Sequence, residues 1–378
     1  MSEWFRMTLG DFVDLQRGHD LPSGRRVPGT VPVVGSGGIT GWHNEAKVSG
    51  PGVTLGRAAN LGVPTLVQGD FWPLNTTLYV TNFRGNSVRF VYHLFQVLDL
   101  GGFNSGSVQP MLNRNYIKSF PIRVPGRAEQ AAIAEVLRSL DEKIAVNERI
   151  ASTADALART HYERERCGLV GQTERLDRLA RVVVGGTPSR ANPDFWNQGT
   201  VNWINSGKAN EFRVTEPSEL ITEAGLAGSS VKMMPPGATL IGITGATMGQ
   251  TSRLEITAGG SQNVAGVWSE DPALNDWLFY DIQARVADLT KHASGGAQQH
   301  INKKIITDLD CVVPDAPKLD EWHRTTAPLL ARVAHALVEN RTLATLRNAL
   351  LPQLMSGRLR VKDADTAENA EGTVEEHV

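Results

Sequence analysis

Apolar residues recur at every third or fourth position along residues 124–150, just after a proline–glycine break. They fall at Ile133, Leu137, Leu140, Ile144 and Ile150, and mostly polar or charged side chains lie between them. This spacing puts the apolar side chains on one stripe of a helix, as in helices that pack lengthwise against each other. We therefore predict a long helix here, either a linker or half of an interface.

An internal repeat supplies a partner for this helix. Residues 105–125 align without a gap with residues 294–314, at an offset of 189, and residues 9–18 align with residues 176–185 at an offset of 167. Each copy of the first stretch leads into a helical pattern, at about 128–161 and about 317–351. Helices of about 34 residues are about 50 Å long. The chain therefore alternates module, long helix, module, long helix.

Polar residues and a proline add detail to the two helices. Asn147 and Asn340 each lie near the middle of an apolar seam, where they are either surface residues or a polar pair that fixes the register between the helices. Because an interior proline kinks a helix, Pro328 predicts that the second helix begins near Ala327 or bends there. Gln109 and Gln298, beside the matched Ser-Gly pairs, are expected to stabilise turns.

Short runs prone to form strands alternate with glycine-rich turns inside both modules. Strands are predicted within residues 31–42, 50–57, 75–83 and 87–95, and again within 200–207, 235–249, 251–260 and 264–271. The predicted fold class is α/β (α+β), with two pseudo-twofold-related modules of mixed, mostly antiparallel sheets, separated by two long antiparallel coiled-coil helices. The expected domains are 1–126, 127–165, 166–315, 316–362 and an acidic disordered tail, 363–378.

Composition narrows the class of protein. The 378 residues are 41% hydrophobic and include only two cysteines, which favours a reducing cytoplasm over a disulfide framework. The N-terminus shows no signal-peptide pattern, and no stretch reaches the roughly 20 apolar residues of a membrane span. We therefore expect a cytoplasmic protein.

The net charge of −2 conceals an uneven distribution. Residues 1–126 carry 11 Lys and Arg against 7 Asp and Glu, whereas residues 363–378 carry six acids and no Lys or Arg. Without this tail the chain would be at +4. The overall charge neither requires nor excludes a nucleic-acid partner.

Motifs that would carry catalysis are incomplete. "NPDF" (192–195) approaches the Asn-Pro-Pro-Phe loop of amino-methyltransferases, but no glycine-rich loop of a βαβ unit accompanies it, so we interpret it as a turn. "GATMGQT" (245–251) lacks the lysine of a phosphate loop and is interpreted as a hairpin turn. The nine histidines show no metal-binding spacing, and Cys311 is expected in the core. The sequence favours a binding protein without chemistry of its own.

At the level of motifs the chain resembles the specificity subunits of type I restriction-modification systems. In the first half the resemblance rests on "TLGDFVDLQRG", "VPVVGSGGITGWHNEAKVSGPGVTLGRAANLG" and "GDFWPLNTTLYV", and in the second on "LARVVVGGTPSRANPDFWNQGTVNWINSGKANE" and "PPGATLIGITGATMG". "IRVPGRAEQAAIAEVLRSLDEKI" resembles the start of the family's first helix and "LLPQLMSGRLRV" the end of its second. The resemblance spans about residues 6–362. The segment before the second helix departs from it, because "VPDAPKLDEWHRTTAPLL" lacks the Glu-Gln of the first copy.

The resemblance implies a non-catalytic, prokaryotic, cytoplasmic subunit that acts in phage defence. Its two modules would be target-recognition domains that read a bipartite, asymmetric site on double-stranded DNA. It would assemble with two methyltransferase (modification) subunits and with two restriction (translocase-nuclease) subunits. No cofactor is expected in this chain, since S-adenosylmethionine, ATP and Mg²⁺ would bind to the partners. An alternative is the specificity subunit of a methylation-only or related phage-defence system.

Such modules need Lys and Arg for phosphates, and amide or hydroxyl side chains for base edges. Each candidate could equally be an ordinary surface residue. The candidates for DNA binding are Lys47, Arg57, Asn60, Arg84, Arg89, Lys208, Asn210, Arg213, Arg253, Gln262 and Lys291. Two other classes remain open. A fused nuclease or methyltransferase is disfavoured because modules and helices occupy nearly the whole chain. The other class is a pure scaffold, in which the helices hold partners and the modules bind protein; a phosphate-type salt dependence of DNA binding would distinguish a DNA-binding subunit from it.

Overall fold

The computed structural model describes residues 3–100, 111–169, 173–291 and 300–361. The chain divides into two compact units: unit 1 is Met1–Ala145 with Arg341–Val378, and unit 2 is Val146–Asn340. The border therefore falls inside both long helices, and each unit contains a part of each helix. The domain boundaries expected from the sequence stay a prediction. Gln109, Gln298 and the acidic tail lie outside the described residues.

Both long helices exceed their predicted length. Helix α4 (Arg127–Cys167) and helix α10 (Ala316–Ser356) each have 41 residues, or about 62 Å of helix, and their first and last residues are related by the offset of 189. Helix α10 continues through Pro328, so the prediction that it begins near Ala327 is wrong. A proline removes one backbone donor, and α10 is anchored before it by the buried Leu319 and Trp322 and after it by the buried Leu330.

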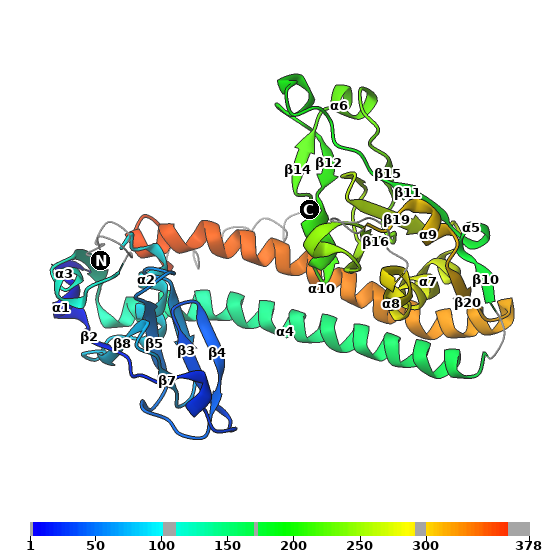
Figure 1. The fold of residues 1–378 in the computed structure, drawn as a ribbon. Coiled ribbons are helices and arrows are strands. Elements are labelled where there is room, and N and C mark those ends of the chain that lie inside the picture. The colour runs from blue at the N-terminus through cyan, green and yellow to red at the C-terminus, as the bar shows by residue number, and fades with distance from the viewer. Residues whose placement is uncertain (1–2, 101–110, 170–172, 292–299, 362–378) are drawn as a thin grey trace, which may run out of the picture. The chain divides into compact units, whose positions relative to one another are not determined.

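The two long helices pack antiparallel within each unit (Figure 1). In unit 1, Nη1 of Arg347 on α10 donates to Asp141 of α4 at 2.9 Å. In unit 2, the fully buried Asn147 donates to Oε2 of Glu339 at 2.7 Å, beside an apolar cluster that includes Ala151 and Val333. Asn147 therefore makes a polar contact between the two helices, with Glu339 as a partner, while the register role of Asn147 and Asn340 stays a prediction.

The described residues of unit 1 form three small sheets and three short helices. The sheets have the strand orders β2-β8-β5-β6, β4-β3-β7 and β1-β9, and among these described strands only β3 and β7 pair in parallel. The elements are β1 (Trp4–Thr8), α1 (Leu9–Phe12), β2 (Asp14–Arg17), β3 (Val31–Gly35), β4 (Gly38–His43), β5 (Gly52–Gly56), β6 (Pro64–Val67), β7 (Trp72–Pro73), β8 (Thr77–Asn82), α2 (Val88–Val97), α3 (Arg114–Ile117) and β9 (Pro121–Pro125).

The segment 87–95, predicted as a strand, is instead the helix α2. The side chain of Ser87 caps it by accepting from the backbone N–H of Phe90. Phe90, Val91, Leu94 and Phe95 are buried, a helical spacing that covers one face of the four-stranded sheet. The β-branched and aromatic content suggested a strand, but the spacing of the buried positions, which determines the packing, is that of a helix.

Unit 2 repeats this plan with additional strands. Its sheets have the orders β11-β19-β16-β17-β13, β14-β12-β18-β15 and β10-β20. Within residues 173–291 and 300–340, parallel pairing of strands is found only at β12–β18 and β13–β17. The elements are β10 (Thr173–Arg175), α5 (Leu176–Leu179), β11 (Arg181–Val184), β12 (Val201–Ile204), β13 (Arg213–Val214), β14 (Glu219–Ile221), α6 (Glu223–Ala227), β15 (Met233–Met234), β16 (Thr239–Gly242), β17 (Thr251–Leu254), β18 (Ala258–Gly260), β19 (Val264–Trp268), α7 (Pro272–Ala284), α8 (Val286–Lys291), α9 (Lys303–Thr307) and β20 (Asp310–Val312).

Buried polar groups connect the sheet-rich part of unit 2 to its helices. Asp281 of α7 is fully buried and accepts from the hydroxyl of Tyr162 on α4 at 2.7 Å, from Nε of Arg285 at 2.9 Å and from the backbone N–H of Val312 at 3.2 Å. Aromatic rings surround this carboxylate, including Trp277. A carboxylate in such a site is stable only while its partners remain in place.

The structure confirms the internal repeat at the level of single strand pairs. In unit 1, β2 pairs with β8 so that Gln16 lies opposite Tyr79, and in unit 2, β11 pairs with β19 so that Val183 lies opposite Gly266. The two pairings are related by the sequence offsets 167 and 187, and the strands β5 and β6 correspond in the same way to β16 and β17. Equivalent positions in the two modules can therefore be identified without ambiguity.

Candidate functional site

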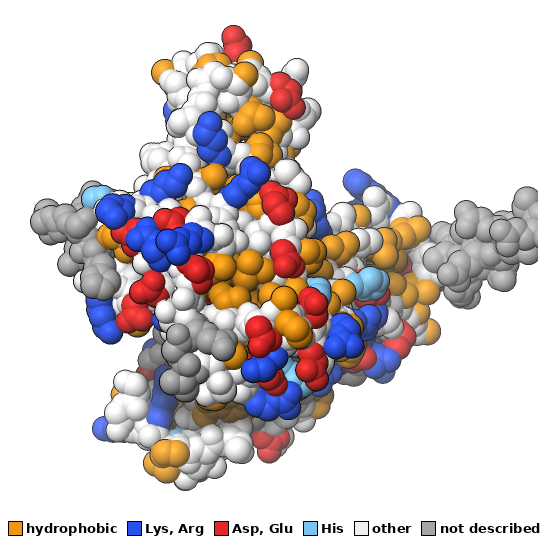
Figure 2. Space-filling view, turned by 90° about the vertical axis from the view of Figure 1, so that its right-hand side faces the viewer, with side chains coloured by type: hydrophobic (Ala, Val, Ile, Leu, Met, Phe, Trp, Pro, Cys, Tyr) orange, Lys and Arg blue, Asp and Glu red, His pale blue; other side chains and the backbone are white. Residues whose placement is uncertain are grey.

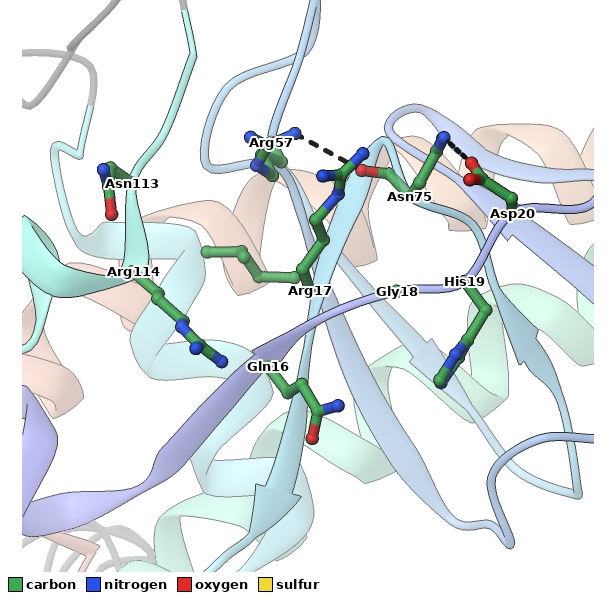
Figure 3. A pocket seen from close by; sticks show the side chains of 10 residues that line it. Gln16, Arg17, Gly18, His19, Asp20, Arg57, Asn75, Asn113 and Arg114 are labelled. Atoms are coloured by element: carbon green, nitrogen blue, oxygen red, sulfur yellow. Dashed lines mark hydrogen bonds between the residues drawn. The ribbon is translucent and has the colours of Figure 1, made fainter.

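A polar cavity of about 600 Å³ opens in unit 1 at one end of the four-stranded sheet. Its walls come from segments far apart in the sequence: the end of β2 and the residues after it, the residue after β5, the segment before β8, and the start of α3. The lining residues are Gln16, Arg17, Gly18, His19, Asp20, Arg57, Asn75, Leu78, Asn113 and Arg114 (Figure 3). Three arginines and one aspartate make this cavity positively charged.

Two of the three arginines lie next to each other, and none of the three forms an ion pair among the described residues. Figure 3 shows the guanidinium groups of Arg17 and Arg57 next to each other. Burial lowers the pKa of Arg57, and the nearby charge of Arg17 lowers it further. Within the described part of the chain, neither of these guanidinium groups nor that of Arg114 forms an ion pair within 4.0 Å. Like charges held together in this way favour an anionic ligand.

Amide side chains lie beside these cations. Nη1 of Arg57 donates to the backbone carbonyl of Asn75 at 3.5 Å, and Nδ2 of Asn75 donates to the carboxylate of Asp20. Asn113 caps α3 by accepting from the backbone N–H of Asn115. The cavity therefore combines groups suited to phosphate with groups able to hydrogen-bond the edge of a base.

The second module carries a hollow of about 480 Å³ beside the end of β16, and its lining differs from that of the cavity in unit 1. Its residues are Ser206, Thr244, Gly245, Ala246, Thr247, Asn263 and His300. Thr244 and His300 form an isolated bridge that corresponds to the bridge between Ala58 and Met111 in unit 1. The two modules thus present hydroxyl, amide and imidazole groups at one site and arginines at the other.

The DNA-binding candidates in the first module differ in whether their side chains are free to contact DNA. Arg57 lines the cavity, Asn60 is exposed in the turn between β5 and β6, and Lys47 is exposed with Nζ 4.8 Å from the centre of the Trp72 ring. Arg84 and Arg89 are already engaged: Arg84 pairs with Asp14 at 2.8 Å, and Arg89 pairs with Glu142 at 3.3 Å. Both pairs are partly exposed, so they are weak and could be exchanged for a phosphate.

Three cationic candidates in the second module point into the protein. Arg213 is buried and paired with Asp155 of α4, and Arg253 pairs with Asp276 at 2.6 Å. Lys208 is buried and pairs with Glu211 at 2.8 Å. These ion pairs fix the module on its own helices, and a buried guanidinium does not reach a phosphate.

The remaining candidates of unit 2 lie at the surface. Asn210 and Lys291 are exposed, and Lys291 pairs with Asp288 at 3.3 Å. Gln262 is exposed and accepts a hydrogen bond from the hydroxyl of Thr187. On the face drawn in Figure 2, basic and acidic side chains are interleaved with apolar ones.

Sequence reasoning named only Arg57 among the residues that line the cavity. It missed the other polar lining side chains, which are Gln16, Arg17, His19, Asp20, Asn75, Asn113 and Arg114. A signal was available for Gln16 and Arg17, because they stand near the end of the duplicated stretch 9–18, where the two copies diverge. Arg17 corresponds to Val184, whereas Arg114 corresponds to Lys303. Divergence inside an otherwise matched repeat marks positions that the fold does not require.

Groups for catalysis do not gather in the described residues. No cluster of three or more His, Cys, Asp or Glu able to hold a metal ion is found among them. Cys311 is buried, and burial raises the pKa of its thiol, so it is the core residue that the sequence predicted. "NPDF" forms a single 3-10 turn, and "GATMGQT" connects the antiparallel strands β16 and β17, as expected. None of the helices in the described residues could span a membrane.

The fold and site define a two-module binding protein whose modules share a scaffold and differ in their polar surfaces. Residues 1–154 match the family model of the "Type I restriction modification DNA specificity domain". The chain is 23% identical over 316 residues to the type I restriction enzyme EcoR124I/EcoR124II specificity subunit of Escherichia coli. The aligned region covers 76% of each of the two chains. It is 20% identical over 193 residues to the HindI specificity subunit of Haemophilus influenzae, covering 50% of this chain and 41% of that one.

Among solved structures, the fold is similar to that of the type I restriction-modification S subunit from M. genitalium. The TM-score is 0.65 at 12% identity, over 93% of this chain and 96% of the other. This likeness confirms the predicted fold class. Residues 1–154 therefore belong to the type I restriction modification DNA specificity domain. The chain as a whole is similar to the specificity subunits of type I restriction-modification systems, which are non-catalytic.

Proposed function

We propose that this chain selects the DNA sequence on which a type I restriction-modification complex acts. Each module binds one part of a bipartite, asymmetric site on double-stranded DNA. The observation that carries the proposal is the cavity at the end of β2, where Arg17, Arg57 and Arg114 have no ion-pair partner among the described residues and lie beside amide side chains.

The chemistry of this cavity fits DNA. Guanidinium groups bind phosphate oxygens and set the position of the module, and amides such as that of Asn75 are suited to the edges of bases in the major groove. The hollow of the second module has a different lining, so it would read other bases. Because the two modules share a scaffold but contact different bases, the DNA site that they recognise together is asymmetric.

The reaction itself belongs to partner subunits. The chain docks two modification subunits, which bind S-adenosylmethionine and methylate adenine, and two restriction subunits, which use ATP and Mg²⁺. A complex with modification subunits alone would only methylate. The role of this chain in either complex is to bind DNA and to hold the enzymatic subunits next to it.

Methylation is expected only from the assembled complex. The purified chain with S-adenosylmethionine and DNA should transfer no methyl groups and make no cuts, whereas addition of its modification subunit should methylate one bipartite motif. Methylome sequencing of a host that carries both proteins measures this motif. Methyl transfer by the pure chain, or methylation with no two-part motif, would overturn the proposal.

The two long helices are expected to set the spacing of the motif. Both α4 and α10 run from one unit into the other. Insertion of seven residues after Asn147 and of seven after Val338 retains the apolar seam and the contact between Asn147 and Glu339. Each helix becomes longer by about 10 Å, the rise of about three base pairs. The unread gap in the motif should grow by about this amount.

The half-sites themselves should not change in this experiment. A matched control inserts the heptad into α4 alone, which breaks the register of the helix pair and should abolish methylation. Altered half-sites at a constant gap would mean that the helices do not determine the spacing.

A further inference from the structure

The repeat places a pair of linked polar side chains at the same position in both modules. In unit 1, Nδ2 of Asn75 donates to the carboxylate of Asp20, and in unit 2, the hydroxyl of Thr187 donates to Oε1 of Gln262. Asp20 and Thr187 are related by the offset of 167, and Asn75 and Gln262 by the offset of 187. These two offsets also relate the paired strands that the four residues flank, β2 and β8 in unit 1 and β11 and β19 in unit 2.

Backbone contacts around the two pairs confirm that they are equivalent. The N–H of Gly18 donates to Thr77 at 3.0 Å, and the N–H of Gly185 donates to Val264 at 3.1 Å, in the same relation. The next residues repeat this agreement: His19 donates to Pro73, and Gly186 donates to Gly260, both at 2.8 Å. Each amide therefore stands between two matched backbone hydrogen bonds, so its position is fixed by the scaffold.

We infer that Asn75 and Gln262 are the corresponding base-reading residues of the two modules, and that Asp20 and Thr187 position them. This inference rests on the proposed function and adds the residues that determine specificity. Both hydrogen bonds lie at the surface, where a fold gains little from them, and Asn75 lies in the cavity beside Arg17 and Arg57. A side-chain amide binds adenine through two hydrogen bonds, since its oxygen accepts from N6 and its NH₂ donates to N7.

The two positioning residues, Asp20 and Thr187, differ in how strictly they fix the orientation of the neighbouring side-chain amide. A carboxylate only accepts, so Asp20 forces Asn75 to turn its NH₂ group inward, and the oxygen and the second N–H remain for a base. A hydroxyl can donate or accept, so Thr187 accommodates Gln262 in both orientations of the amide. The module of unit 1 should therefore discriminate strongly between DNA bases at the position that Asn75 contacts. The module of unit 2 should discriminate less at the position that Gln262 contacts.

Single substitutions in the assembled modification complex test this assignment. Asn75→Ala should remove the preference at one base of one half-site, with a loss of discrimination on the order of 10- to 100-fold, and should leave the other half-site intact. Gln262→Ala should do the same in the other half-site only. Methylome sequencing reads the motif, and competition binding against duplexes altered at single base pairs measures the loss.

The role of Asp20 requires a separate readout. Asp20→Asn retains the size of the side chain but can also donate, so Asn75 is no longer held in one orientation. Discrimination at that base should fall while the affinity for the best duplex changes less than threefold. A residue that only braced the loop would instead alter thermal stability and leave the base preference unchanged.

Exposed amides elsewhere in each module provide the controls. Asn44→Ala in unit 1 and Asn197→Ala in unit 2 should leave the motif unchanged. If the Asn75 and Gln262 variants form complexes that methylate the original motif with full discrimination, the inference is wrong while the proposed function stands. If the wild-type complex methylates no bipartite motif, the proposed function itself fails.

Discussion

Replacement of Arg17, Arg57 and Arg114 by alanine should weaken DNA binding of the assembled complex on the order of 100-fold at about 0.15 M salt. Each guanidinium that leaves a phosphate reduces the number of released counterions by about one, so the slope of log K against log salt should become shallower by about three. Binding isotherms at four or more salt concentrations measure both quantities. The effect should be similar for any duplex sequence, because phosphate contacts carry no sequence information.

Three other arginines make a matched control. Arg164, Arg178 and Arg181 are each about 70% exposed and lie outside the cavity, so their replacement makes the same change in net charge. This control triple should change the slope by less than one. Equal effects of the two triples would show that net charge alone attracts the DNA, and the cavity would lose its role.

Replacement of Asp281 by alanine should destabilise unit 2 by about 3–5 kcal/mol, the usual cost of breaking a buried ion pair. The hydroxyl of Tyr162 and the backbone N–H of Val312 would lose their acceptor, and the charge of Arg285 would lose its buried partner. For a unit of this size the melting temperature should fall by roughly 6–20 °C. Differential scanning calorimetry of the purified chain measures this shift.

Asp288→Ala removes the same charge from the neighbouring helix α8, where the carboxylate is about half exposed and pairs with Lys291. This variant should lie within about 0.5 kcal/mol of the wild type, since an exposed pair contributes little. A melting temperature of Asp281→Ala equal to that of the control would mean that the buried cluster around Asp281 does not hold unit 2 together.

The repeat architecture could be predicted because it depends on the order of residues. The offset of 189, found between residues 105–125 and 294–314, also relates both ends of α4 to both ends of α10. The offset of 167 relates α1 and β2 to α5 and β11. Asn147 was recognised because a polar residue inside an apolar seam is exceptional. These features are local or periodic, and each is visible along the chain.

Errors arose where local preference and tertiary packing disagree. The run at 87–95 has the composition of a strand, yet Phe90, Val91, Leu94 and Phe95 cover the sheet at helical spacing. Pro328 is compatible with a helix because the apolar contacts on both sides of it retain the helical path. Composition describes the preference of an isolated segment, whereas burial decides its structure in the protein.

The cavity could not be assembled from the sequence. Arg17, Arg57 and Arg114 are brought together only because β2 and β5 lie in one sheet that ends near the start of α3. Conversely, Arg213 and Arg253 follow a surface-like pattern of residues, but Arg213 is buried and Arg253 is partly buried. Their partners Asp155 and Asp276 come from α4 and α7. The positive charge of a side chain indicates an anionic ligand, but the fold determines which charged side chains are exposed to that ligand.

Because the border between the two units falls inside both long helices, unit 1 contains the first and the last part of the chain. This arrangement affects the order in which the units can fold during synthesis on the ribosome. All of unit 2 (Val146–Asn340) is synthesised before the segment that begins at Arg341, and this segment supplies Leu354 and Met355 to the core of unit 1. The first module therefore emerges early but lacks part of its interior until the rest of the described chain has been made. During this interval its apolar surface on α4, including Ile133 and Leu137, stays open to chaperones or to aggregation. Translation that stops before residue 341 would leave a complete second unit attached to an unfinished first one.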